Sequence, residues 1–498
     1  MPVEQYILTI DQSTSGTKGL LVNLQGRITA KYWQAHQQIY PQPGWVEHDP
    51  EEIYGSVLAV VEKLIQESGI NPDSIAGVSI SNQRETAVVW NKVTGAPVYN
   101  AVVWQCMRGD QICAEIKAAG FAEEVRRRTG LVIDPYFSAS KIQWILEHVE
   151  DAGENRDQLL FGTIDSWLIW KMTNGEVHAT DYSNASRTML YNIQELMWDP
   201  FLFDLFRIPM AMAPEVRSSN AVFGVTDLGG LLPGPVPVCG VIGDSQAALF
   251  GQGCTTSGSA KVTYGTGSSI VLNIGRKYQL APAGIVTSLA WGIDGTVDYI
   301  FEGNAHCTGK TIDWIVNTLG LIPDAASSDA AARSVADNGG VYMVPAFVGL
   351  GAPYWNSDVQ AAIFGLTFNA TKAHIVRAGL ESIAYQIYDV LSCMQGSDGL
   401  QYVKADGGAS QNSFLMQFQA DILQLPVATL PYGELSALGA SYMGGLGLGF
   451  WQSLDEIAAL QADPKLYQPR MPLDERCRML AGWKAAVDKL ISGGNQGE

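Results

Sequence analysis

Three short turns rich in glycine, serine and threonine, each at the end of an apolar segment, could hold a phosphate. They span residues 11–17, 264–269 and 406–410. Small residues let backbone N–H groups approach phosphate oxygens, and hydroxyl side chains add donors. Asp11 and Asp244 also follow apolar segments with the pattern of strands. This combination favours phosphoryl transfer, in which carboxylates hold Mg²⁺ and accept the proton of the attacking hydroxyl.

The same residues also have an ordinary structural interpretation. A single turn of this kind is usually a hairpin, and a lone aspartate after a strand usually caps its own turn. Three turns together with two aspartates favour nucleotide binding over that alternative. Lys18, directly after the first turn, could neutralise a terminal phosphate.

Three other common catalytic motifs are excluded, one because its spacing is wrong and two because they are absent from the sequence. The segment 303–311 is close to a P-loop, but five residues instead of four separate its first glycine from Gly309-Lys310-Thr311. No G-x-G-x-x-G follows a strand, so the dinucleotide fingerprint is missing. No G-x-S-x-G elbow of a serine hydrolase is present either.

The turns need strands and helices to position them. Residues 6–10 and 19–23 predict an antiparallel hairpin around the first turn. Residues 49–52 offer an N-cap aspartate, a first-turn proline and a capping-box glutamate for a helix that ends near Gly69.

The pattern at the start of the chain, an apolar strand with an aspartate at its end and a small-residue turn between two strands, recurs about 240 residues further on. Residues 238–242 predict a strand that delivers Asp244, and residues 261–273 predict strands on both sides of the second turn. We interpret the chain as two α/β domains of the same design, residues 1–240 and 241–498.

Composition narrows the class of protein. The 498 residues include 31 Lys and Arg against 50 Asp and Glu, a net charge of −19, which argues against binding to nucleic acid or an anionic membrane. No apolar run is long enough to span a membrane and the first residues lack a signal-peptide layout, so we expect a cytoplasmic protein. The seven cysteines are scattered, which predicts reduced thiols.

The longer motifs resemble those of the FGGY carbohydrate kinases, and within that family those of the glycerol kinases. The similar stretches occur in order from about residue 6 to about residue 451 and include 81–86, 101–106, 129–137, 181–187, 243–251, 345–355 and 406–409. The resemblance implies two actin-like, ribonuclease-H-like ATPase domains flanking a catalytic cleft. It implies a kinase that uses ATP and Mg²⁺ to phosphorylate a terminal hydroxyl of a small polyol, either glycerol, giving glycerol 3-phosphate, or a close relative.

The resemblance also carries site residues over by position. The polyol-binding set, with Asp244 as the catalytic base, comprises Arg84, Glu85, Trp104, Tyr136, Asp244, Ser245 and Ser269. The ATP-binding set comprises Ser13, Thr14, Ser15, Lys18, Thr266, Gly309, Gly408 and Asn412, with a lysine at position 18 where the family usually has an arginine. Asp11 and Asp244 would hold Mg²⁺. A homodimer or homotetramer is usual in enzymes of this kind.

Two members of the polyol set depart from the glycerol kinase pattern. Ser245 stands in place of a common glutamine, and Ser269 in place of an aromatic residue. One hypothesis is an enlarged pocket for a four- or five-carbon polyol or ketose, such as erythritol, threitol, xylitol or erythrulose. The other is that neighbouring side chains fill the space and that glycerol remains the substrate.

A third departure concerns regulation. Pro235 occupies the place of the arginine with which regulated glycerol kinases bind fructose 1,6-bisphosphate, which predicts no such inhibition. Two other classes of protein remain as alternatives, a non-catalytic sugar-sensing protein on the same fold and an actin-like polymerising protein. The joint presence of Asp11, Arg84, Glu85 and Asp244 argues against both.

Overall fold

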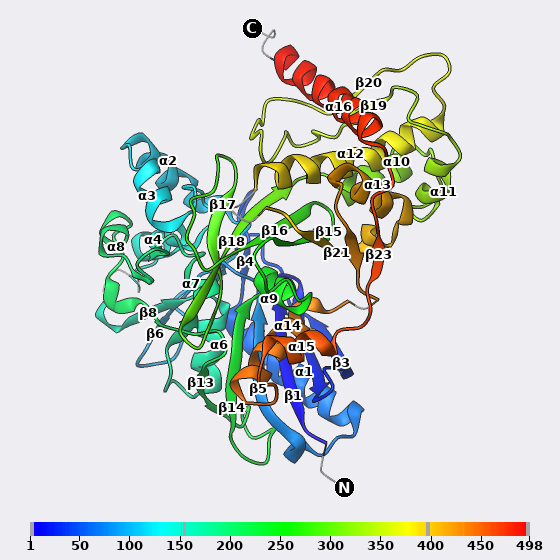
Figure 1. Ribbon diagram of the computed structural model, residues 1–498. Helices are drawn as coiled ribbons and strands as arrows, with labels where there is room; N and C mark the ends of the chain where they lie inside the picture. The colour runs from blue at the N-terminus through cyan, green and yellow to red at the C-terminus, as the bar shows by residue number, and fades with distance from the viewer. Residues whose placement is uncertain (1–3, 151, 153–155, 395–398, 432, 495–498) are drawn as a thin grey trace.

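The structure, a computed structural model, describes residues 4–150, 152, 156–394, 399–431 and 433–494. Its first large sheet has the strand order β13-β14-β5-β1-β2-β3. The strands are β1 (Tyr6–Ser13), β2 (Gly16–Asn23), β3 (Ile28–Ala35), β5 (Ile75–Asn82), β13 (Val222–Thr226) and β14 (Val236–Gly243). Figure 1 shows β1, β5 and β14 in the lower half of the molecule.

The second large sheet has the strand order β17-β18-β16-β15-β21-β22-β23. The strands are β15 (Ser259–Tyr264), β16 (Ser268–Gly275), β17 (Val286–Ile293), β18 (Thr296–Ala305), β21 (Tyr402–Asp406), β22 (Val427–Thr429) and β23 (Lys465–Tyr467). It lies above the first sheet in Figure 1.

The two sheets repeat one topology. The series β3-β2-β1-β5-β14-β13 corresponds to β18-β16-β15-β21-β22-β23, and successive pairs are antiparallel, antiparallel, parallel, parallel and antiparallel in both. The predicted repeat is therefore confirmed for the hairpins β1–β2 and β15–β16, but the strand before Asp244, β14, belongs to the first sheet and not to the second copy. The first turn is tighter than predicted, because pairing of β1 with β2 continues from Asp11 and Lys18 to Ser13 and Gly16.

The helix after residue 49 forms as predicted, with one local difference. Helix α1 (Pro50–Ser68) is capped by Asp49, whose side chain accepts from the backbone N–H groups of Glu51 and Glu52, and it ends at Gly69 in the left-handed conformation. The capping-box prediction for Glu52 is wrong, because its carboxylate accepts from the backbone N–H of Gln37 instead.

A late segment of the chain returns to the first sheet. Helix α14 (Leu435–Gly447) packs against α9 (Asp244–Gly251) and against β14, β5 and β1 (Figure 1). A Cβ atom on Gly439 would lie 1.8 Å from the carbonyl oxygen of Ala247, so only glycine permits this approach. Strand β14 crosses the predicted domain boundary at 240/241 and lies wholly in the first sheet. That boundary stays a prediction.

Smaller elements complete both halves. The remaining helices are α2 (Asp110–Ala118), α3 (Ala122–Thr129), α4 (Ser138–His148), α6 (Ile164–Met172), α7 (Tyr182–Ala185), α8 (Pro200–Leu205), α10 (Gly309–Asn317), α11 (Ser327–Arg333), α12 (Lys372–Cys393), α13 (Ser413–Leu423), α15 (Leu454–Leu460) and α16 (Leu473–Gly494). The two-stranded pairs are β4 (Glu47–His48) with β7 (Ala101–Val102), β6 (Val88–Asn91) with β8 (Leu159–Gly162), β9 (Ala179–Asp181) with β12 (Glu215–Arg217), β10 (Tyr191–Asn192) with β11 (Met197–Trp198), and β19 (Tyr342–Val344) with β20 (Ala362–Phe364).

All seven cysteines are free thiols, as the sequence predicts, and five of them are buried. Among the described helices, none combines the length and the apolar character needed to cross a lipid bilayer.

Candidate active site

One cavity of about 140 Å³ brings the predicted polyol-binding residues together. Its lining consists of Thr14, Arg84, Glu85, Trp104, Tyr136, Asp244, Ser245, Ser269, Glu302 and Asn304. All seven members of the predicted polyol set are included, and Thr14 belongs to the predicted ATP-binding set. The tip of the first hairpin and the candidate base therefore face the same small space.

Asp244 stands where β14 ends and α9 begins. Its Oδ1 accepts from the backbone N–H of Ser245 at 2.7 Å and lies 3.3 Å from Nε of Arg84. The side chain keeps 40% of its surface exposed. The carboxylate is thus oriented by two contacts and still accessible to a substrate hydroxyl.

Arg84 and Glu85 follow the end of β5. Glu85, which lines the cavity, has a φ of 61°, so the chain turns sharply at this residue. Gly243 leaves room for the arginine, because a Cβ atom there would lie 2.7 Å from Cγ of Arg84. Both side chains are nearly fully buried.

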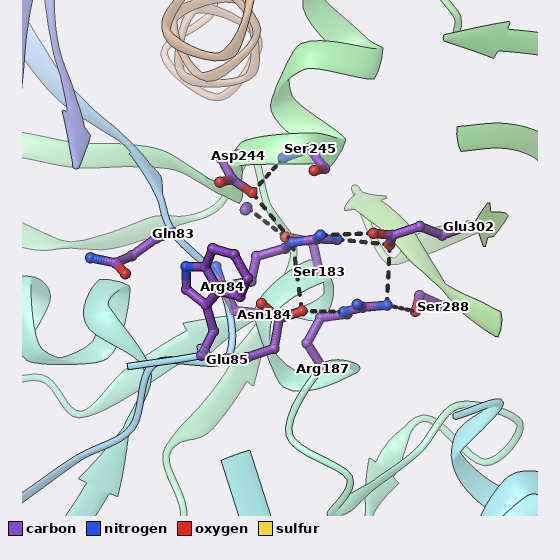
Figure 2. Close-up of polar contacts among 12 residues, drawn as sticks. Gln83, Arg84, Glu85, Ser183, Asn184, Arg187, Asp244, Ser245, Ser288 and Glu302 are labelled. Atoms are coloured by element: carbon purple, nitrogen blue, oxygen red, sulfur yellow. Dashed lines mark hydrogen bonds and ion pairs between the residues drawn. The ribbon is translucent and has the colours of Figure 1, made fainter. Parts of the chain in front are cut away.

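A buried charge network is formed by Arg84, Arg187, Glu85 and Glu302 (Figure 2), and all of these except Arg187 line the cavity. The guanidinium of Arg84 donates from Nη1 and Nη2 to the two carboxylate oxygens of Glu302, both at 2.9 Å. Arg187 donates from Nε to Glu85 at 2.6 Å and lies 3.1 Å from Glu302 through Nη1. Burial alone would raise the pKa of Glu302, but Arg187 and Arg84 outweigh it and hold that pKa at about 2.

The network joins the two halves of the molecule. Glu302 lies on β18 of the second sheet, whereas Arg84 and Arg187 follow β5 and α7 of the first half. Neither Glu302 nor Arg187 is among the site residues predicted from the sequence. A usable signal was present, since Glu302 is the only charged residue in the apolar stretch 299–305 and Arg187 ends one of the family-like segments.

Two aromatic rings form another wall of the cavity. Trp104 and Tyr136 meet edge to face, with ring centroids 5.5 Å apart. Nε1 of Trp104 donates to the hydroxyl of Thr14 at 2.9 Å. This bond ties the aromatic wall to the tip of the first hairpin.

The other residues predicted at the first hairpin lie around this tip. Ser13 donates from its hydroxyl to the carbonyl of Gly16 at 2.9 Å, and Ser15 is exposed at the turn. Lys18 forms an ion pair with Glu434, which precedes α14. An anion that recruits Lys18 must therefore compete with this carboxylate.

The ATP-binding set of the second half gathers at the ends of β15 and β21, which run parallel. Thr266 lies in the turn between β15 and β16, and the backbone N–H of Gly309 donates to the carbonyl of Gly265 at 2.9 Å. Gly408 is exposed just beyond β21. Asn412 caps α13, accepting from the backbone N–H of Leu415 at 2.9 Å.

The residues proposed for Mg²⁺ suit that ion. Asp11 on β1 is half-buried, and the loss of solvation raises its pKa to about 6; the charge of Lys18 opposes the rise, while that of Asp244 adds to it. Two neighbouring carboxylates that repel each other are a fitting environment for a divalent cation. The described residues contain no cluster of three or more metal-binding side chains. Mg²⁺ commonly takes only one or two protein carboxylates and completes its shell with water and phosphate oxygens.

Comparison with known proteins gives consistent matches along the chain. Residues 6–251 match the profile of the N-terminal domain of the FGGY family of carbohydrate kinases, and residues 260–448 match that of its C-terminal domain. Glycerol kinase 1 of Thermotoga maritima is 52% identical over 98% of this chain and 100% of that protein. A glycerol kinase of Xanthomonas axonopodis pv. citri is 49% identical over 98% and 99%.

Solved structures give the same result for the fold. The crystal structure of Plasmodium falciparum glycerol kinase with ADP superimposes with a TM-score of 0.92 at 33% identity, covering 98% of both chains. A ligand-bound xylulose kinase from Lactobacillus acidophilus superimposes with a TM-score of 0.88 at 22% identity over 99% of both chains. The expected architecture of two actin-like, ribonuclease-H-like domains is confirmed.

Proposed function

Because the chain belongs to the FGGY family of carbohydrate kinases, we propose that it transfers the γ-phosphoryl group of ATP to a terminal hydroxyl of glycerol, giving glycerol 3-phosphate. The observation that carries this proposal is the single cavity in which Asp244, Arg84, Glu85 and Trp104 converge. Similar proteins are glycerol kinases, and one of them has been crystallised with ADP. We also propose that the protein is located in the cytoplasm and that it forms a homodimer or a homotetramer.

In the proposed mechanism, Asp244 accepts the proton of the attacking hydroxyl. Its carboxylate is exposed to the cavity and is positioned by the backbone of Ser245 and by Nε of Arg84. Catalysis of phosphoryl transfer depends mainly on positioning the reactants and on stabilising the charge of the transition state. A carboxylate held next to the attacking hydroxyl contributes to the positioning. Mg²⁺, held by Asp11 and Asp244, would neutralise phosphate charge when bound.

The rest of the cavity suits a polyol. Arg84 can donate to one hydroxyl and Glu85 can accept from another, whereas the rings of Trp104 and Tyr136 cover the carbon skeleton. We assign the polyol mainly to residues 1–240 and the nucleotide mainly to residues 241–498. Hairpin residues Ser13, Thr14 and Ser15 would reach the transferred phosphate from the first half, and Lys18 would reach it on leaving Glu434.

A coupled assay of ADP release tests the proposed activity. The purified protein with ATP, Mg²⁺ and glycerol should release ADP and form one equivalent of glycerol 3-phosphate, identified by ³¹P NMR. Omission of glycerol is the control for ATP hydrolysis. A protein that binds polyols but releases no ADP with any of them would instead be a sensor, which contradicts the proposed function.

Regulation by fructose 1,6-bisphosphate should be absent. The exposed turn at Gly229 and Gly230 is held by the carboxylate of Asp227, and Pro235 follows it without an intervening Lys or Arg. A bisphosphate needs cationic partners, and an aspartate repels it. Titration of the bisphosphate into the coupled assay should leave the rate unchanged, and a saturable inhibition at micromolar concentration would contradict this prediction.

A further inference from the structure

The small cavity at Asp244 continues into a larger one. A second cavity, of about 470 Å³, shares with the first the five residues Trp104, Tyr136, Ser269, Glu302 and Asn304. Asp244 and Ser245 line only the small cavity, whereas Asp134 and His306 line only the large one. A chain that begins at Asp244 can therefore leave the small cavity past Ser269 and Asn304.

The passage between the cavities is polar on the side of the second sheet. Ser269 on β16 and Asn304 on β18 are direct cross-strand partners, so their side chains lie on the same face of the sheet. The hydroxyl oxygen of Ser269 is buried and has no hydrogen-bond partner within the described part of the chain. A buried hydroxyl without a partner costs free energy that a ligand hydroxyl would recover.

The large cavity combines polar and aromatic groups. Asp134, Arg187 and His306 are among its polar lining residues, and the indole of Trp355 forms part of its apolar surface. Hydroxylated carbon chains need this combination, because their hydroxyl groups require partners while their C–H faces pack on rings. A purely apolar extension would leave the polar side chains unpaired.

We propose that the site accepts a polyol or ketose of four or five carbons, bound with one terminal hydroxyl at Asp244 and the far end at Ser269 and Asn304. The inference rests on the proposed phosphorylation at Asp244 and adds substrates longer than glycerol. The bond that forms joins the terminal oxygen of the substrate to the γ-phosphorus of ATP. The bond between the γ-phosphorus and the oxygen that bridges it to the β-phosphorus breaks, and ADP leaves with that oxygen. The hydroxyl proton goes to Asp244.

The first test compares kcat/KM for glycerol, erythritol, both threitols, xylitol and erythrulose in the coupled assay. At least one of the longer compounds should match or exceed glycerol. Glycerol exceeding every longer compound by about tenfold or more would overturn the inference and leave the proposed function standing, since a site built for a hydroxyl discriminates strongly against its absence. Absence of activity with the whole panel would overturn the proposed function itself.

The second test uses two variants at the passage. Ser269→Phe fills the space, so the ratio of kcat/KM for the best longer substrate to that for glycerol should fall by about tenfold or more. Ser269→Ala is the matched control, which removes the hydroxyl but keeps the passage open, and it should lower the ratio less. Asn304→Ala supplies an independent variant if Ser269→Phe fails to fold. An unchanged ratio in Ser269→Phe would overturn the inference. If Ser269→Phe does not fold, an unchanged ratio in Asn304→Ala would overturn it.

Discussion

Replacing Asp244 by asparagine should lower kcat for glycerol phosphorylation by about 10²–10⁴-fold, the usual contribution of a positioned general base. Asparagine has nearly the same shape and can keep the contact with the backbone N–H of Ser245. It cannot accept a proton at neutral pH and it removes one of the two carboxylates assigned to Mg²⁺. The loss should therefore appear mainly in kcat rather than in folding.

The measurement combines steady-state kinetics with calorimetric titration of ADP. Binding of metal-free ADP should persist in Asp244→Asn, since the residues predicted to contact the nucleotide lie elsewhere. Asp227→Asn is the matched control, because Asp227 lies on an exposed turn and accepts from Gly229; its kcat should equal that of the wild type. Turnover of Asp244→Asn within about threefold of the wild type, well inside the effect of a general base, would contradict the assigned role.

Much of this site can be predicted from the sequence because its residues lie at the ends of regular elements. Asp244 follows β14 directly, and Arg84 and Glu85 come just after β5. Parallel pairing of β5 with β14 brings both strand ends to the same edge of the sheet. Local pattern and family motif therefore indicate the same residues, and the cavity contains all of the predicted polyol set.

The contacts that sequence reasoning missed are long-range ones. Lys18 was predicted as a phosphate ligand, and nothing nearby in the sequence indicates that Glu434, 416 residues away, forms an ion pair with it. Glu302 likewise pairs with Arg84 over 218 residues. Such pairs depend on how the two halves pack, which neither hydrophobic periodicity nor turn composition specifies.

Replacing Glu302 by glutamine should lower the free energy of unfolding by about 3–5 kcal/mol, because it leaves Arg84 and Arg187 buried without their shared carboxylate. The amide keeps the shape of the side chain but offers one acceptor oxygen and no charge. Arg84 would lose its bidentate partner, so KM for the polyol should also rise. Urea unfolding and steady-state kinetics measure the two effects.

The pH dependence separates lost charge from altered packing. The pKa of Glu302 is lowered from 4.5 to about 2 in the folded protein, the two arginines outweighing the effect of burial. The stability due to its charge is therefore fully present above pH 4.5 and is lost as the pH falls towards 2. The difference in unfolding free energy between wild type and Glu302→Gln should shrink over that range. A difference independent of pH would show that packing, not charge, is responsible.

Glu381→Gln is the matched control for this substitution. Glu381 is also buried and pairs with Arg377 at 2.7 Å, but burial raises its pKa to about 7, so the folded protein stabilises its charge less than that of Glu302. Removal of its charge should therefore cost less than removal of the charge of Glu302. Glu381 lies on α12, outside the lining of both cavities, so its substitution should leave KM for the polyol unchanged. Equal effects of the two variants on KM would contradict a positioning role for Glu302, because a general loss of stability would then account for both.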